Sequence, residues 1–113
     1  MGGADEPFFL QTRKQDRRAL VELQGAVDSS TANEVTVALS RLADDDVDEL
    51  VVDLTAATMA DTAALGALVL AQKEARRRHR DVVLAGVGAE TRRLLELTGL
   101  DRTFRVVSAA ERL

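Results

Sequence analysis

Two short apolar runs, each followed by a helix-like segment, most constrain how this chain can fold. "LVVDL" at residues 50–54 and "VVLAGV" at residues 82–87 are nearly continuous in apolar side chains, as expected for strands covered on both faces. Strands joined through helical crossovers must lie parallel. The sequence therefore predicts a mostly parallel sheet with helices packed on it.

The segment before these runs predicts a hairpin and one helix. Strands are expected over residues 8–14 and 19–23, where apolar and polar side chains alternate across a short connection. A helix is expected over residues 30–42, starting with a capping box between Thr31 and Glu34. The side chains expected to line one face in each of these elements are Phe8, Leu10 and Thr12, then Ala19, Val21 and Leu23, then Val35, Ala38, Leu39 and Leu42.

The remaining elements follow the same logic. The acidic run "DDDVDE" at residues 44–49 is expected to be a solvated connecting loop, and "TAATMA" at residues 55–60 to lead into the next helix. Helices are expected over residues 62–79 and 89–99, a short strand over residues 104–107, and a terminal helix from residue 108. The predicted interior side chains of the two helices are Leu65, Leu68, Val69, Leu70, Leu94, Leu95 and Leu97, with Gly99 as the left-handed residue that ends the second.

The fold class that results is α/β, one domain with the order β-β-α-β-α-β-α-β-α and a mixed, mostly parallel sheet of about five strands. Residues 1–7 are expected to form a flexible tail and residues 8–113 the domain. The sequence shows no internal repeat, and its 113 residues are near the commonest size for a single domain.

Composition excludes several classes of function. The net charge of −4 argues against nucleic acid as a partner, because phosphate binding needs a basic surface. No apolar run has the length of a membrane span, and the start of the chain lacks the pattern of a signal peptide. There is no cysteine. We therefore expect a cytoplasmic protein without disulfides or a membrane span.

The residue types needed for catalysis or cofactors are also scarce. The single histidine, His79, lies inside "RRRHR", where a solvated helix end is expected rather than a catalytic base. One histidine without cysteine excludes the usual zinc sites. "AGVGAE" at residues 85–90 has Thr91 where a dinucleotide loop would have its third glycine, so an ordinary strand-to-helix turn is expected. We expect neither enzyme activity nor a cofactor.

The candidate functional motif is "DTAALG" at residues 61–66. It follows a predicted strand and opens a predicted helix, the position where function gathers in open α/β sheets. A hydroxyl at a helix N-terminus can accept a phosphate, because the unpaired N–H groups there favour negative charge. On spacing alone two interpretations stay open: Asp61 or Thr62 is only an N-cap, or the Thr62 hydroxyl is a switch.

Three segments together resemble the STAS domain of bacterial anti-sigma factor antagonists. These are "GAVDSSTANEV" at residues 25–35, "VVDLTAATMADTAALGALVLAQKEARRR" from residue 51, and "VVLAGVGAETRRLLELTGLDRTF" from residue 82. They resemble the family's "GELDxxxA" segment, its Asp-Ser-Ser/Thr-Gly-Leu-Gly helix start and its "LxLTGLDxxF" segment. The resemblance covers roughly residues 8–108.

The resemblance implies a domain that binds an anti-sigma factor and so frees a sigma factor. In the family the anti-sigma factor is also a kinase that phosphorylates the hydroxyl residue after the motif Asp, and a phosphatase restores it. ATP belongs to the kinase, so no cofactor is implied. By position the phosphorylation site is Thr62, and the partner-binding residues implied are Asp28, Asp61, Thr62, Ala63, Ala64, Leu65 and Gly66.

This chain departs from the family pattern at three positions of the motif. Threonine at position 62 replaces the usual serine, and Ala63 and Ala64 replace the usual second hydroxyl and glycine. Thr62 is therefore the one hydroxyl that a switch in this motif can use. A member that binds its partner without phosphorylation stays open, as does self-association in a weak homodimer.

Two other functions are compatible with a chain of this size and fold class. A receiver domain would use Asp53 as phosphoacceptor, but it needs an acidic cluster for Mg²⁺ and a lysine near the last strand. The sequence has only Asp28 where the acidic cluster should be, and its only lysines, Lys14 and Lys73, are not near the last strand, so a receiver domain is excluded. Asp53 is expected at a strand end near the switch loop. The second rival keeps the fold: a STAS adaptor of a lipid or anion transport system, or of a stress-sensing complex, without the phospho-switch.

Overall fold

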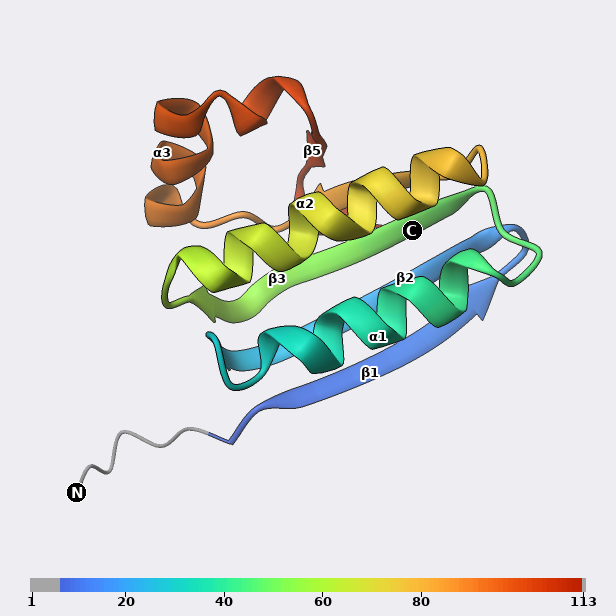
Figure 1. Cartoon of the computed structure of the whole chain (residues 1–113), viewed down its shortest axis with the longest axis horizontal. Helices are drawn as coiled ribbons and strands as arrows, with labels where there is room; N and C mark the ends of the chain where they lie inside the picture. Colours follow the sequence, from blue (N-terminus) through green and yellow to red (C-terminus); the bar gives the residue numbers. More distant parts are fainter. Residues whose placement is uncertain (1–6, 113) are drawn as a thin grey trace.

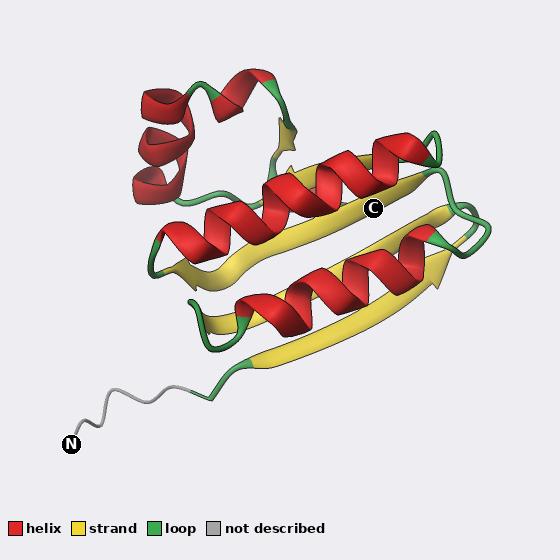
Figure 2. Cartoon of the chain, viewed as in Figure 1, coloured by secondary structure: helices red, strands yellow, loops and turns green. Residues whose placement is uncertain are grey.

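The computed structural model describes residues 7–112, which form a five-stranded sheet with three α-helices (Figure 1, Figure 2). The expected tail over residues 1–7 lies outside the described residues except for Pro7. In chain order the elements are β1 (Phe9–Gln15), β2 (Arg18–Val27), α1 (Ala32–Ala43), β3 (Glu49–Met59), α2 (Thr62–Arg77), β4 (Asp81–Ala85), α3 (Ala89–Thr98), a 3₁₀ turn (Leu100–Arg102), β5 (Arg105–Val107) and a second 3₁₀ turn (Ala109–Glu111).

The strands lie in the sheet in the order in which they occur in the chain. β1 pairs antiparallel with β2, and every later pairing is parallel. This confirms the predicted mixed α/β sheet. The expected terminal helix is only the short 3₁₀ turn Ala109–Glu111.

The main core lies between the sheet and the helices. Ala19, Val21 and Leu23 of β2 point into it, so the predicted alternation is confirmed. Each buried leucine contributes about 1.5–3 kcal/mol to folding. The predicted interior places of Leu70 and Leu97 are wrong, because their side chains are 48% and 73% exposed. The buried members from the helices are Val35, Leu39, Leu42, Ala43, Ala64, Leu65, Leu68, Ala71, Ala75 and Leu95.

The other face of the sheet has a smaller buried cluster made only of strand residues: Leu20, Val51, Val83 and Ala85, with Val107 packed against it. On the same face Glu49 Oε1 accepts from Arg18 Nε at 3.0 Å and its Oε2 from Arg105 Nη2 at 2.7 Å. Long side chains of this kind cover apolar surface with their aliphatic stems. The strands are thus buried on this face too, as predicted. The burial there comes from strand side chains, and no α-helix of the described residues contributes to this cluster.

β3 runs further than predicted, and Asp53 explains its irregular course. The register against β2 shifts between Glu22 and Gln24, which makes a β-bulge after Asp53. Asp53 is buried, and its Oδ1 accepts from the backbone N of Thr55 at 3.0 Å and from its hydroxyl at 2.6 Å. The expectation that Asp53 ends the strand is wrong, because pairing with β2 resumes beyond the bulge and continues to Met59.

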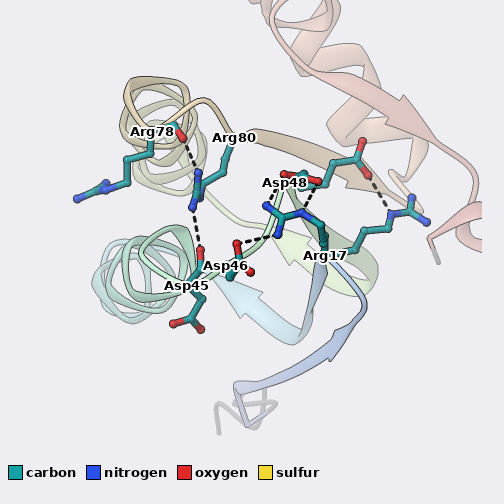
Figure 3. Close-up of polar contacts among 8 residues, drawn as sticks. Arg17, Asp45, Asp46, Asp48, Arg78 and Arg80 are labelled. Carbon is teal, nitrogen blue, oxygen red and sulfur yellow. Dashed lines mark hydrogen bonds and ion pairs between the residues drawn. The ribbon is translucent and has the colours of Figure 1, made fainter.

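Ion pairs tie together the loops at the end of the sheet where the parallel strands begin (Figure 3). Arg17, in the hairpin turn, binds Asp48 with two hydrogen bonds of 2.8 and 2.9 Å and Asp46 with one of 2.7 Å. Arg80 donates to the carbonyl of Asp45 at 2.9 Å. Residues 44–48 of the acidic run are a connecting loop, as predicted, and Glu49 begins β3. The carboxylates of Asp46 and Asp48 bind Arg17 of the hairpin turn.

The contribution of this cluster to stability should decrease at acid pH. The hydrogen bond from Arg17 holds the pKa of Asp48 below its ordinary value of 3.8. A carboxyl whose pKa is depressed by folding adds stability above its unfolded pKa, and that stability is lost as the pH falls through the folded pKa. The melting temperature of Asp48→Asn should therefore lie below that of the wild type at about pH 6, and the gap should shrink below about pH 4. Asp101→Asn, at an exposed site, is the control; equal gaps at both pH values would contradict the prediction.

The bulge leaves no room for a side chain at Gly86. Gly86 has φ +66°, and a Cβ built on it would lie 2.0 Å from the hydroxyl oxygen of Thr55. Gly86→Ala should lower the free energy of unfolding by about 1–3 kcal/mol, because the bulge must shift and the backbone is strained. Urea titration measures this. Gly88→Ala, where the new Cβ would meet nothing within 4 Å, is the matched control and should change stability far less.

Candidate functional site

Asp61 is the N-cap of α2 and holds the start of that helix. Its Oδ1 accepts hydrogen bonds from the backbone N of Ala63 at 3.0 Å and of Ala64 at 3.3 Å. Its backbone is extended, as an N-cap requires. Of the two residues considered as caps, Asp61 is therefore the N-cap, and the hydroxyl of Thr62 has no capping role.

The same carboxylate joins α2 to a second loop. Asp61 Oδ2 accepts from the backbone N of Ser29 at 3.2 Å. Ser29 belongs to the loop between β2 and α1, and this loop and the start of α2 lie at the same end of the sheet (left in Figure 1). The site is therefore built from two loops rather than from one motif.

Asp28 organises the loop that contains Ser29. Its Oδ1 accepts from the hydroxyl of Ser30 at 2.6 Å, from the backbone N of Ser30 at 2.9 Å and from the backbone N of Thr31 at 3.2 Å. The hydroxyl of Ser30, followed by its backbone N–H, lowers the pKa of the Asp28 carboxyl. Asp28 is thus an anion held in place a few residues before α1.

The predicted capping box at the start of α1 is wrong. Thr31 is the N-cap, but its side chain makes no capping hydrogen bond. Its hydroxyl accepts from the backbone N of Asp28 at 3.0 Å and donates to the carbonyl of Ala26 at 3.1 Å. The carboxylate of Asp28 binds the amides of Ser30 and Thr31, so the turn before the helix is held by Asp28.

Thr62 is the first residue of α2, and its side chain is exposed. Among the residues that the structure describes, none forms a hydrogen bond with its hydroxyl. A phosphate on this oxygen would extend into solvent from a helix N-terminus, where the partial positive charge of the helix favours it. The geometry thus supports an accessible acceptor.

The other motif residues divide by burial. Asp61 and Gly66 are exposed and Ala63 is half-buried. Ala64 and Leu65 are 0% and 5% exposed. The side chains of Ala64 and Leu65 therefore serve the core, and the surface around Thr62 is made by the exposed motif residues together with the Asp28–Thr31 loop.

Sequence reasoning missed Ser29 and Ser30, which belong to this surface. In their segment the resemblance implied only Asp28 as a partner-binding residue. The carboxyl ends of parallel neighbours meet at one edge of a sheet, and Val27 of β2 pairs with Met59 of β3. That adjacency was the signal that could have placed the two loops together.

The other candidate residues named from the sequence lie apart from Thr62 or form an ordinary turn. His79 follows the last turn of α2, at the far end of that helix from Thr62. In residues 7–112 no cluster of three metal-ligating side chains was found, and no helix there has the length and apolar character of a membrane span. Gly86 and Gly88 form the turn between β4 and α3.

Comparison with known proteins identifies the fold family. The STAS domain family matches residues 9–112. An anti-sigma factor antagonist from Mycobacterium paratuberculosis is similar at 26% identity and a TM-score of 0.77, covering 88% of this chain and 85% of that one. The phosphorylated form of the Bacillus cell fate determinant SpoIIAA has 15% identity and a TM-score of 0.74, with 91% and 93% covered.

RsbS from Moorella thermoacetica, with a serine-to-glutamate substitution, has 21% identity and a TM-score of 0.73, covering 88% of this chain and 86% of that chain. The family match extends over nearly the whole described chain, including β3, the start of α2 and α3. The chain therefore belongs to the STAS domain family.

Proposed function

We propose that this protein is an anti-sigma factor antagonist whose binding is switched off by phosphorylation of Thr62. The observation that carries the proposal is the exposed Thr62 hydroxyl at the start of α2, beside the capping carboxylate of Asp61. The 26% identical relative with the same fold is named as an anti-sigma factor antagonist. The partner is an anti-sigma factor of the serine/threonine kinase type in the cytoplasm.

In this proposal the protein contributes a substrate hydroxyl and a binding surface, and it is not an enzyme. The kinase transfers the γ-phosphoryl group of ATP to the Thr62 oxygen, the hydroxyl proton goes to a base of the kinase, and ADP leaves. A phosphatase hydrolyses the ester and restores the hydroxyl. The nucleotide is held by the kinase, so this chain needs no cofactor.

Electrostatics explains why phosphate would end binding without unfolding the domain. Asp61 and Asp28 already place carboxylates in the two loops of the site. A phosphate adds about 1.5 to 2 negative charges. A partner surface that is complementary to the free hydroxyl would have to remove water from these charges when the complex forms. The N-terminus of α2 offsets part of that charge within this domain, so the cost falls on the complex.

The surface proposed to meet the partner is formed by Asp28, Asp61, Thr62, Ala63 and Gly66. Ala64 and Leu65 support it from the core. A Cβ on Gly66 would meet nothing within 4 Å in this chain. The bare backbone there lets a partner approach α2 closely.

Substitution of Thr62 tests the switch. Thr62→Ala should fold normally and bind the anti-sigma factor whether or not ATP is present. Thr62→Glu should fold but bind about tenfold or more weakly, because a carboxylate is added beside Asp61. A pull-down from the source cell's lysate, with mass spectrometry, identifies the partner, and calorimetry with that partner measures affinity.

Thr12→Glu, at an exposed position of β1, is the matched control and should bind like the wild type. If Thr62→Glu binds as tightly as the wild type, and Thr62 carries no phosphate after incubation with lysate and ATP, the switch is refuted. The protein would then be a STAS adaptor, of a transport system or a stress-sensing complex, without this regulation.

Gly66→Ala separates stability from binding. Alanine in the helix interior should raise the free energy of unfolding by about 0.5–1 kcal/mol, since the Cβ meets open space and the unfolded chain loses freedom. The same methyl should weaken binding, because it stands where the partner backbone is proposed to approach. Urea titration and calorimetry on one preparation measure both. Tighter or unchanged binding would remove Gly66 from the partner surface.

A further inference from the structure

The solvent-facing side of α2 is a continuous stripe that starts at Thr62. Thr62, Gly66, Leu70, Lys73 and Arg77 are spaced along the helix so that they share one side. All five are exposed, and the buried residues of α2 lie on the opposite side. At 1.5 Å per residue, Leu70 lies about 12 Å and Arg77 about 22 Å along the helix axis from Thr62.

An apolar side chain among cations is the unusual feature of this stripe. Leu70 is 48% exposed. It borders an open hollow of about 580 Å³ whose other lining residues are Lys73, Glu74, Arg76 and Arg77. Four of these five residues are apolar or cationic, although the chain as a whole carries a net charge of −4.

Helix electrostatics accounts for only part of this pattern. Cations in the last turn complement the helix dipole, and Arg76 and Arg77 lie in that turn. Glu74 is shared by Arg77 at 3.3 Å and Arg78 at 3.8 Å. Lys73 precedes the last turn and has no ion-pair partner among residues 7–112. The exposed Leu70 and the unpaired Lys73 are left without a role in this domain.

The proposed switch surface is too small by itself for a stable complex. A standard protein interface buries about 800 Å² on each partner and uses about 20–30 residues a side. The exposed residues around Thr62 belong to two short loops and to the first turns of α2. The stripe continues from Thr62 along α2 without a break, and α2 extends from that end of the sheet towards the opposite end (Figure 1).

We propose that the anti-sigma partner also docks on the Leu70–Lys73–Arg77 part of α2, through a segment with acidic side chains around an apolar one. This inference rests on the proposed function and extends its surface. The apolar side chain covers Leu70 and the carboxylates face Lys73 and Arg77. This docking contact is separate from Thr62, so the kinase can hold the domain there while its catalytic site acts on the Thr62 hydroxyl.

A second hollow next to the switch fits an acidic partner less well. It has a volume of about 200 Å³ and lies between the end of β3 and α3, where Met59, Leu94 and Leu97 line it. Its charged lining residues are one glutamate and one arginine, Glu90 and Arg93. Charge complementarity therefore favours α2, and Leu97 becomes the competing anchor in the test.

The test measures affinity for the anti-sigma factor kinases of the source genome. Each kinase is purified and titrated with the 113-residue chain at low and high salt. Leu70→Ser should weaken binding at least about tenfold. Lys73→Glu should weaken it similarly at low salt and reduce its salt dependence. Leu97→Ser and Val37→Ser, at apolar sites that are 73% and 39% exposed, are matched controls that should bind like the wild type. Circular dichroism melting checks that each variant folds.

The outcomes separate the two proposals. If no kinase binds the wild type, the proposed function fails, and this inference fails with it. If the wild type binds and Leu70→Ser binds equally well, only the α2 docking surface is refuted. Loss of binding in Leu97→Ser instead would place the anchor on α3. Loss in Leu70→Ser and Lys73→Glu, with both controls unchanged, supports the surface proposed here.

Discussion

The parallel pairing of β2 with β3 is the constraint on which the rest of the structure depends. It requires α1 to cross the sheet, which buries Val35 and Leu39 against the strands. It also brings Val27 level with Met59, and the backbone N of Ala60 donates to the carbonyl of Val27 at 2.9 Å. The loops that follow β2 and β3 are therefore forced together, and Asp61 can bind Ser29 across them. The candidate site is a consequence of strand direction.

The two ends of the sheet are held by different forces. At the end where the parallel strands begin, Arg17 binds Asp46 and Asp48 through charge-assisted hydrogen bonds. At the switch end, Asp28 and Asp61 bind backbone N–H groups of their own loops and helices. A charge added at Thr62 would thus lie at the opposite end of the sheet from the ion pairs, with the core between them. Under the proposed function, a phosphate on Thr62 would therefore change binding at little cost in stability.

Patterns among neighbouring residues correctly predicted the features that depend only on neighbouring residues. The alternation of Ala19, Val21 and Leu23 and the left-handed Gly99 are both found in the structure. The errors came from side-chain hydrogen bonds that the spacing of apolar residues does not reveal. Asp28 takes the amides of Ser30 and Thr31, so the capping box does not form. The β-bulge that Asp53 and Thr55 support lets β3 continue where the sequence suggested a loop.

The candidate site divides in the same way. Asp61 and Thr62 were found because a cap and a helix start are read from neighbouring residues. Ser29 was missed because its contact with Asp61 spans 32 residues of sequence. The prediction that Leu70 lies in the core was wrong for a related reason. A leucine in an apolar helix is easily taken as buried when its position around the helix axis is not compared with the positions of the other apolar residues. Leu70 shares the phase of Thr62 and Gly66, opposite the buried Leu68. Leu70 is thus an apolar side chain out of phase with the core, in a hollow that Lys73 and Arg77 also line, and the proposed acidic partner would cover it.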